Sequence, residues 1–123
     1  METMKAAKAK TGKRAGPRCP AESTLEVLSG RWKVPIVWHL FGGTMRFSEL
    51  VRALHGVTPK MLAQQLRELA RDGVVKRRVY RQVPPKVEYS LTPTGMSLKP
   101  VIDAMCNWGI GRGEACLRPR APR

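Results

Sequence analysis

One segment of the chain combines apolar residues at helical spacing with clear start and stop signals. Thr58 is a suitable N-cap, and Pro59 fits the first helical position, where no backbone hydrogen bond is lost. Gly73 supplies the stop. The apolar residues of one face are Leu62, Leu66 and Leu69. The pattern predicts an amphipathic helix between Thr58 and Gly73.

The opposite face of this helix carries long cationic and amide side chains. On a wheel of about 100° per residue, this face contains Lys60, Gln64, Arg67 and Arg71. Arg and Lys pair well with guanine, and Gln pairs well with adenine. The face therefore matches DNA, whereas a solvated charged face is the alternative for an isolated helix.

Two helices are expected before this segment. Residues Ala21–Leu28 form a short amphipathic helix, with Leu25 and Leu28 on one face. Residues Arg31–Phe41 are densely apolar and predict the central core helix, in which Pro35 must lie near the start. We expect its buried residues to be Ile36, Val37, Leu40 and Phe41. His39 lies among them and is interpreted as a packed or rim histidine rather than a catalytic one.

A helix-turn-helix motif follows from the next segment. Residues Arg46–Leu54 repeat the amphipathic period through Phe47, Leu50 and Leu54. The short turn His55–Val57, which contains a glycine, leads directly into the helix after Thr58. In this motif the second helix enters the major groove, and here the second helix has the cationic face.

After Gly73 the period changes from helical to alternating. Residues Val74–Val83 are β-branched and charged, Pro84–Lys86 makes a turn, and Val87–Leu91 alternates. The pattern predicts a β-hairpin rich in cations, namely Lys76, Arg77, Arg78, Arg81 and Lys86. A basic hairpin after a recognition helix is typical of a wing that contacts the phosphate backbone or the minor groove.

A last helical region begins at Thr92 as its cap and is split by Pro100. Beyond the split, the apolar residues at helical spacing are Val101, Ile102, Met105 and Trp108. We expect this helix to form a homodimer interface with the first helix through Leu25 and Leu28, because two-fold operators favour paired modules. Packing back onto the same core is the alternative.

Composition bounds the chain as one domain with basic ends. We expect residues 1–18 to form a disordered basic arm, 19–111 the folded domain, and 112–123 a basic tail. The formal net charge of +14 favours a polyanionic partner, without separating DNA from RNA or an anionic membrane surface. No apolar run suits a membrane span, which indicates a cytoplasmic protein.

The cysteine and histidine patterns argue against a disulfide framework or a metal site. The three cysteines, Cys19, Cys106 and Cys116, form no CxxC pair, and the two histidines lie in different segments. The sequence also contains no nucleophile–base constellation and no glycine-rich phosphate loop. We therefore expect neither an enzyme nor a bound cofactor.

The order and spacing of short motifs resemble the HxlR-type winged helix-turn-helix transcriptional regulators from about Cys19 to Trp108. The motifs are Cys19-Pro20, Gly30-Arg31-Trp32-Lys33, Arg46-Phe47-Ser48-Glu49-Leu50, Leu66-Arg67-Glu68-Leu69, Asp72-Gly73-Val74-Val75, Pro84-Pro85-Lys86-Val87-Glu88-Tyr89-Ser90-Leu91-Thr92, Gly95 and Trp108. Pro35 and the strongly basic ends depart from the usual pattern. The fold class expected is mainly α with a small β-hairpin (α+β), with the terminal helices forming the dimer interface.

The resemblance implies a regulator that binds double-stranded operator DNA as a homodimer. The expected DNA-binding residues are Arg46, Ser48, Thr58, Lys60, Met61, Gln64, Gln65, Arg67, Arg71, Lys76, Arg77, Arg78, Arg81 and Lys86. Some family members sense oxidants or electrophiles through a cysteine at the start of the first helix, the position of Cys19. A helix N-terminus and the adjacent Arg18 favour the reactive thiolate, whereas a structural role is the alternative.

An RNA- or ribosome-associated winged-helix protein is the alternative function. The basic ends suit such a protein, but the aromatic platform that stacks single-stranded bases is missing. Comparing duplex DNA with structured RNA in a titration separates the two functions. A small-molecule or redox effector is compatible with either.

Overall fold

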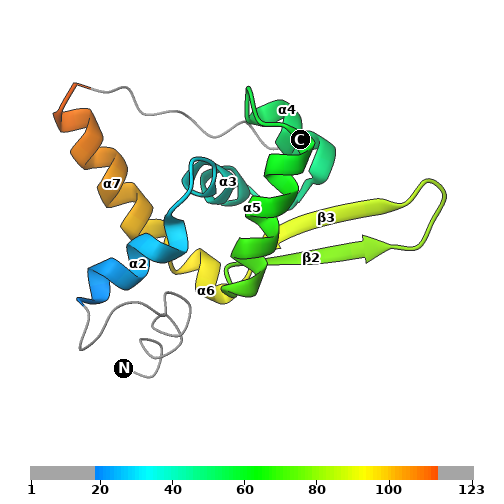
Figure 1. Ribbon diagram of the computed structural model, residues 1–123, viewed down its shortest axis with the longest axis horizontal. Helices are drawn as coiled ribbons and strands as arrows, with labels where there is room; N and C mark the ends of the chain where they lie inside the picture. The colour runs from blue at the N-terminus through cyan, green and yellow to red at the C-terminus, as the bar shows by residue number, and fades with distance from the viewer. Residues whose placement is uncertain (1–18, 114–123) are drawn as a thin grey trace. The chain divides into compact units, whose positions relative to one another are not determined.

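The computed structural model describes residues 19–113, which form short helices and a small antiparallel sheet (Figure 1). In chain order the elements are α2 (Pro20–Leu28), α3 (Lys33–Leu40), β1 (Met45–Arg46), α4 (Phe47–Ala53), α5 (Pro59–Arg71), β2 (Val75–Tyr80), β3 (Lys86–Leu91), α6 (Pro93–Met96) and α7 (Lys99–Gly111). The expected α+β class is confirmed. Within the described range, no helix has the length and apolar character of a membrane span. The expected arm 1–18 and most of the tail 112–123 lie outside the described residues.

The chain divides into two compact units at Gly30, and α2 belongs to the first. This helix begins one residue earlier than expected, because Pro20 occupies its first turn after Cys19 at the N-cap. It ends at Leu28, where the Ser29 hydroxyl donates to the carbonyl of Glu26 at 3.0 Å. The predicted first helix is therefore confirmed.

In the second unit, α3 supplies the centre of the core. Ile36, Val37 and Leu40 are buried as expected, and Pro35 lies in the first turn, where it breaks no helical hydrogen bond. Phe41 differs from the prediction. The helix ends at Leu40, so Phe41 lies at the C-cap and is only half-buried.

Helices α4 and α5 form the predicted helix-turn-helix. The turn contains Gly56 with a φ of 95°, a conformation that glycine adopts without strain. The apolar faces of the two helices are buried through Leu50, Leu54, Leu62, Leu66 and Leu69. The helix-turn-helix therefore joins the same core as α3.

The hairpin is part of a three-stranded sheet with the order β1-β3-β2. Strand β1 was not predicted, because two residues are too few to show an alternating pattern. It pairs antiparallel with β3, with Met45 opposite Tyr89 and Arg46 opposite Glu88. On the other side of β3, Val75 is opposite Leu91 and Tyr80 is opposite Lys86. The connection therefore spans residues 81–85, so it starts three residues before the predicted turn and ends one residue before it.

Backbone hydrogen bonds fix the junction between α5 and the wing. The amides of Gly73 and Val74 donate to the carbonyls of Ala70 and Leu69 at 3.0 and 2.9 Å, which is a Schellman motif. Gly73 has a φ of 79°, as the motif requires. The direction in which β2 leaves the recognition helix is therefore set by the end of α5 itself.

Thr92 ties this junction to α6. Its hydroxyl donates to the carbonyl of Gly73 at 2.5 Å and accepts from the Gly95 amide at 3.0 Å, which confirms the predicted cap. Gly95 is buried, and a side chain there would overlap the carbonyl oxygen of Val74. The last helical region is divided, but the predicted split at Pro100 is wrong, because the break falls at residues 97–98. Pro100 instead lies in the first turn of α7.

Candidate nucleic-acid interface

The exposed face of α5 carries the predicted polar side chains. Lys60, Gln64, Arg67 and Arg71 are all exposed. Thr58 caps the helix by accepting a hydrogen bond from the Met61 amide at 3.1 Å, and Met61 itself is exposed. Gln65 differs from these residues because it is half-buried and its Oε1 is enclosed. The exposed face of α5 therefore contains fewer residues than the sequence predicted to bind DNA.

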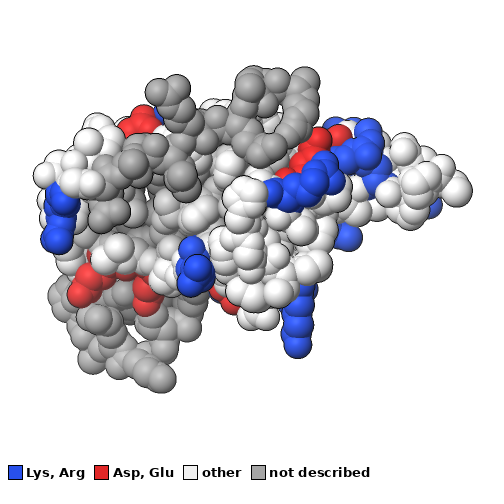
Figure 2. Space-filling view, turned by 90° about the horizontal axis from the view of Figure 1, so that it is seen from above, with Lys and Arg blue, Asp and Glu red and all other residues white. Residues whose placement is uncertain are grey.

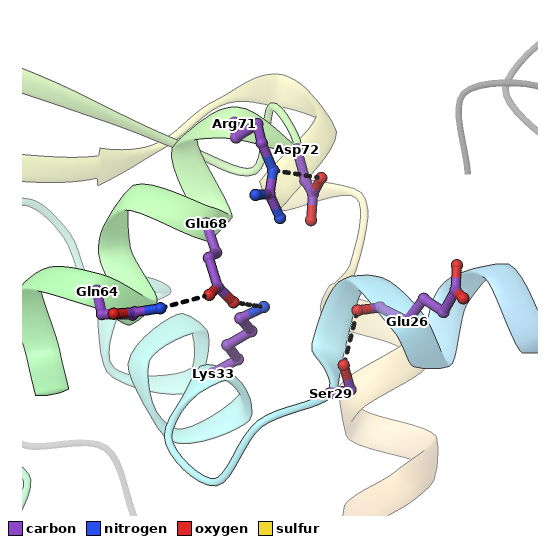
Figure 3. A network of polar contacts seen from close by, with 7 residues as sticks. All are labelled: Glu26, Ser29, Lys33, Gln64, Glu68, Arg71 and Asp72. Carbon is purple, nitrogen blue, oxygen red and sulfur yellow. Dashed lines mark hydrogen bonds and ion pairs between the residues drawn. The ribbon is translucent and has the colours of Figure 1, made fainter. Parts of the chain in front are cut away.

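An ion pair between the buried Lys33 and the half-buried Glu68 joins α3 to α5 (Figure 3). Lys33 is 2% exposed, and its Nζ lies 2.6 Å from Oε1 of Glu68. Lys33 is the first residue of α3, which has no acidic residue in its first turn, so the positive end of the helix adds to the cost of this buried cation. The Glu68 carboxylate from α5 offsets both the charge of Lys33 and the positive end of α3.

The same carboxylate also contacts the exposed face of α5. Gln64 Nε2 donates to Glu68 Oε2 at 3.1 Å (Figure 3). The hydrogen bond from Lys33 holds the pKa of Glu68 below its ordinary value. The hydrogen bond from Gln64 and the positive charge of Arg71 lower this pKa further. Sequence reasoning missed this network. Its one signal was a lysine beside a densely apolar run.

The ends of α4 and α5 add further polar groups. The Arg46 amide donates to Oε1 of Glu49 at 2.8 Å, which fixes the start of α4, and the Arg46 and Ser48 side chains are exposed there. At the other end of α5, Arg71 Nε lies 3.8 Å from Oδ1 of Asp72. The predicted residues Arg46, Ser48 and Arg71 are thus accessible.

Cationic side chains gather along the hairpin, with acidic side chains beside them (Figure 2). The register divides them between two faces, because residues directly opposite in a sheet share a face. Arg77 is opposite the buried Tyr89, whereas Arg78 is opposite Glu88. Lys76 lies on the face of Arg78, and Arg81 is exposed in the connection. The predicted wing cations therefore do not form a single surface.

An aromatic ring organises the outer part of the wing. The Tyr80 ring has the Arg78 guanidinium 5.2 Å and the Lys86 ammonium 4.3 Å from its centroid. Lys86 also lies 3.6 Å from Oε2 of Glu88. Tyr80 thus keeps two cations together near the end of the paired strands.

The residues predicted to form a dimer interface divide by exposure. In α7, Val101, Met105 and Trp108 are exposed, whereas Ile102 is buried. In α2, Leu25 is 61% exposed and Leu28 is buried. Of the residues predicted to form the dimer interface, Ile102 and Leu28 are therefore not exposed.

The candidate sensor Cys19 is exposed at the N-cap of α2. Cys106 is half-buried on α7, whereas Arg18 and Cys116 lie outside the described residues. Between residues 19 and 113, no three His, Cys, Asp or Glu side chains are grouped as metal ligands would be.

A helix-turn-helix followed by a basic hairpin defines a winged helix-turn-helix DNA-binding protein. The chain belongs to the HxlR-like helix-turn-helix family, whose model matches residues 27–115. It is a family of transcriptional regulators, not of enzymes, so the expectation that the chain is not an enzyme is confirmed.

Two relatives from Bacillus subtilis (strain 168) are HTH-type transcriptional regulators. YdeP is 53% identical over 91 residues, which cover 74% of this chain and 71% of YdeP. YtcD is 56% identical over 88 residues, which cover 72% of this chain and 70% of YtcD. The reduced form of the redox regulator HypR has a TM-score of 0.74 and 47% identity, covering 78% of this chain and 95% of HypR.

We predict that Glu68→Leu lowers the free energy of unfolding by about 3–5 kcal/mol, because it leaves the Lys33 ammonium buried without its partner. The double variant Lys33→Met/Glu68→Leu should recover most of this loss. Urea unfolding with an unchanged m-value measures both effects. Equal destabilisation of the single and double variants would contradict the role of the pair.

The ion pair also predicts a pH dependence. Because the folded-state pKa of Glu68 is lowered, its contribution to stability is fully present above the unfolded-state value of about 4.3. That contribution is lost as the pH falls through the lowered pKa. The double variant should lose less stability over this acidic range than the wild type.

Proposed function

We propose that this protein is a sequence-specific regulator that binds double-stranded operator DNA as a homodimer. The observation that carries the proposal is the exposed polar face of α5, whose apolar back is fixed in the core of a helix-turn-helix. Family membership and the two regulators YdeP and YtcD support it. In this arrangement α5 enters the major groove and the wing contacts the backbone or the minor groove.

Different parts of the surface have different tasks in this proposal. Gln64 and Arg67 reach base edges from the middle of α5, where Gln suits adenine and Arg suits guanine. The further predicted contacts to phosphates are Arg46, Ser48, Thr58, Lys60, Arg71, Lys76, Arg78, Arg81 and Lys86. Phosphate contacts set the register and the salt dependence, and base contacts set the sequence preference.

The exposed apolar residues of α7 form the dimer contact in this proposal. Val101, Met105 and Trp108 expose apolar surface on one helix, and Leu25 exposes more on α2. Apolar surface of this kind marks interaction sites, and a two-fold operator requires two recognition helices. A second copy of the chain therefore meets both requirements.

Cys19 is proposed as a sensor of oxidants or electrophiles. Its thiol is exposed at the N-cap of α2, where oxidants and electrophiles can reach it. The likeness to HypR, a redox regulator, supports this role. Modification of Cys19 would act at the start of α2, which carries Leu25 of the proposed dimer contact, and so alter the spacing of the two recognition helices.

For the DNA surface, we predict that Gln64→Ala or Arg67→Ala costs about 1–3 kcal/mol of binding and relaxes the preference at particular base pairs. Arg78→Ala should weaken binding to all duplexes similarly and lower the salt slope by about one. Titrations against selected duplexes, random duplexes and structured RNA, at several salt concentrations, measure these effects.

Equal losses on selected and random DNA for the α5 variants would refute the division of tasks. Tighter binding to RNA would favour an RNA-binding function.

For the dimer, we predict that Met105→Glu produces monomers, because association would bury an unpaired charge. Sedimentation at micromolar concentration measures the change. Met96→Glu is the matched control, since Met96 is similarly exposed but lies on α6. A monomeric wild type, or a Met105→Glu variant that remains dimeric, would refute the proposed interface.

For the sensor, we expect diamide or an electrophilic quinone to change the operator affinity of the wild type and to leave Cys19→Ser unaffected. Substitution removes the exposed thiol that these reagents modify. Cys106→Ser, with the second described cysteine replaced, should still respond. If the wild type and Cys19→Ser respond alike, or neither responds, Cys19 is not the sensor.

A further inference from the structure

The amide of Gln64 is held in one orientation by groups that sequence reasoning did not connect with it. Its Nε2 donates to Oε2 of Glu68 at 3.1 Å, and Oε1 of the same carboxylate lies 2.6 Å from the Lys33 ammonium (Figure 3). Lys33 is buried, whereas Gln64 is exposed. A fixed internal cation is thus linked through one carboxylate to an exposed amide on α5.

The chemistry of the carboxylate decides which end of the amide faces it. An ionised carboxylate only accepts hydrogen bonds, and the contact with Lys33 favours the ionised form. The nitrogen of Gln64 must therefore face Glu68. Its second N–H and its Oε1 remain for a partner.

These two remaining groups match adenine better than guanine. In the major groove adenine offers an acceptor at N7 and a donor at N6, whereas guanine offers acceptors at both N7 and O6. A held amide donates to N7 and accepts from N6 of adenine. Against guanine, its Oε1 would face the O6 acceptor. A freely rotating amide could instead turn its nitrogen toward both guanine acceptors.

We propose that Glu68, anchored on Lys33, is a positioning residue that fixes the Gln64 amide and thereby gives α5 its preference for adenine over guanine at one base pair. The inference rests on the proposed reading of bases by α5 and assigns its specificity. The alternative is that the ion pair only holds α3 against α5, with no effect on the orientation of Gln64.

The double variant Lys33→Met/Glu68→Leu separates these two roles. It removes both charges of the pair together, and apolar replacement of a buried ion pair generally preserves stability. The net charge is unchanged, because one cation and one anion are lost. Non-specific affinity and its salt dependence should therefore equal those of the wild type. Glu68→Gln is the second variant. Lys33 can only donate and so takes the oxygen of the new amide, which leaves the amide nitrogen to donate to Oε1 of Gln64 and turns the Gln64 amide over.

The experiment begins with selection of binding sites from a randomised duplex pool by the full-length wild type and by Gln64→Ala. The position at which Gln64→Ala loses preference is the position that Gln64 reads. Affinities are then measured on duplexes that carry adenine or guanine there. For the double variant and for Glu68→Gln, we expect the preference for adenine over guanine to fall about tenfold. Affinity of the double variant for random DNA should not change.

A double-mutant cycle provides the control for a merely structural role. In the Gln64→Ala background, removal of the ion pair should have no further effect on base preference, and the position read by Arg67 should keep its preference. Unchanged discrimination in the double variant, or losses that spread to the Arg67 position, would overturn the proposal. If the wild type selects no sequence at all, the proposed function itself fails. If it selects one that Gln64→Ala does not alter, Gln64 reads no base and the present inference fails, whereas sequence-specific binding stands.

Discussion

The ion pair between Lys33 and Glu68 joins the core helix α3 to the recognition helix α5. A lysine at the first residue of α3, almost wholly removed from water, is costly unless a carboxylate faces it. The apolar faces of α3 and α5 bring the helices together, but apolar contact is not directional. The ion pair forms in the rotation of α5 that buries Leu62, Leu66 and Leu69, because Glu68 then faces Lys33. That rotation also directs Lys60, Gln64 and Arg67 toward solvent.

A second constraint connects this helix to the wing. The Schellman motif at Gly73 ends α5 and starts β2 within a few residues, and Thr92 binds back to the same turn from the end of β3. Gly95 lets α6 approach the carbonyl of Val74 closely. Both ends of the hairpin are therefore held at the C-terminus of the recognition helix, so the wing and α5 can act on one duplex together.

Much of this arrangement was determined by the sequence alone. The leucines of α5 recur at the spacing of one helical face, Thr58 and Gly73 carry the chemistry of a cap and a stop, and the alternation in β3 marks a strand. These signals are local, because capping, turn formation and amphipathic periodicity depend on residues only a few positions apart. The order of elements and the family therefore follow from the sequence, as does the polar face of α5.

The tertiary structure alone decided features that depend on residues far apart in the chain. Strand β1 has two residues and exists only because β3 offers it a partner. The placement of Arg77 and Arg78 on opposite faces follows from the register with β3, and a shift of one residue would exchange them. Lys33 and Glu68 pair although they lie far apart in the sequence, so no periodic pattern of residues could have linked them. Sequence patterns identify which residues are polar, but only packing determines which of them meet.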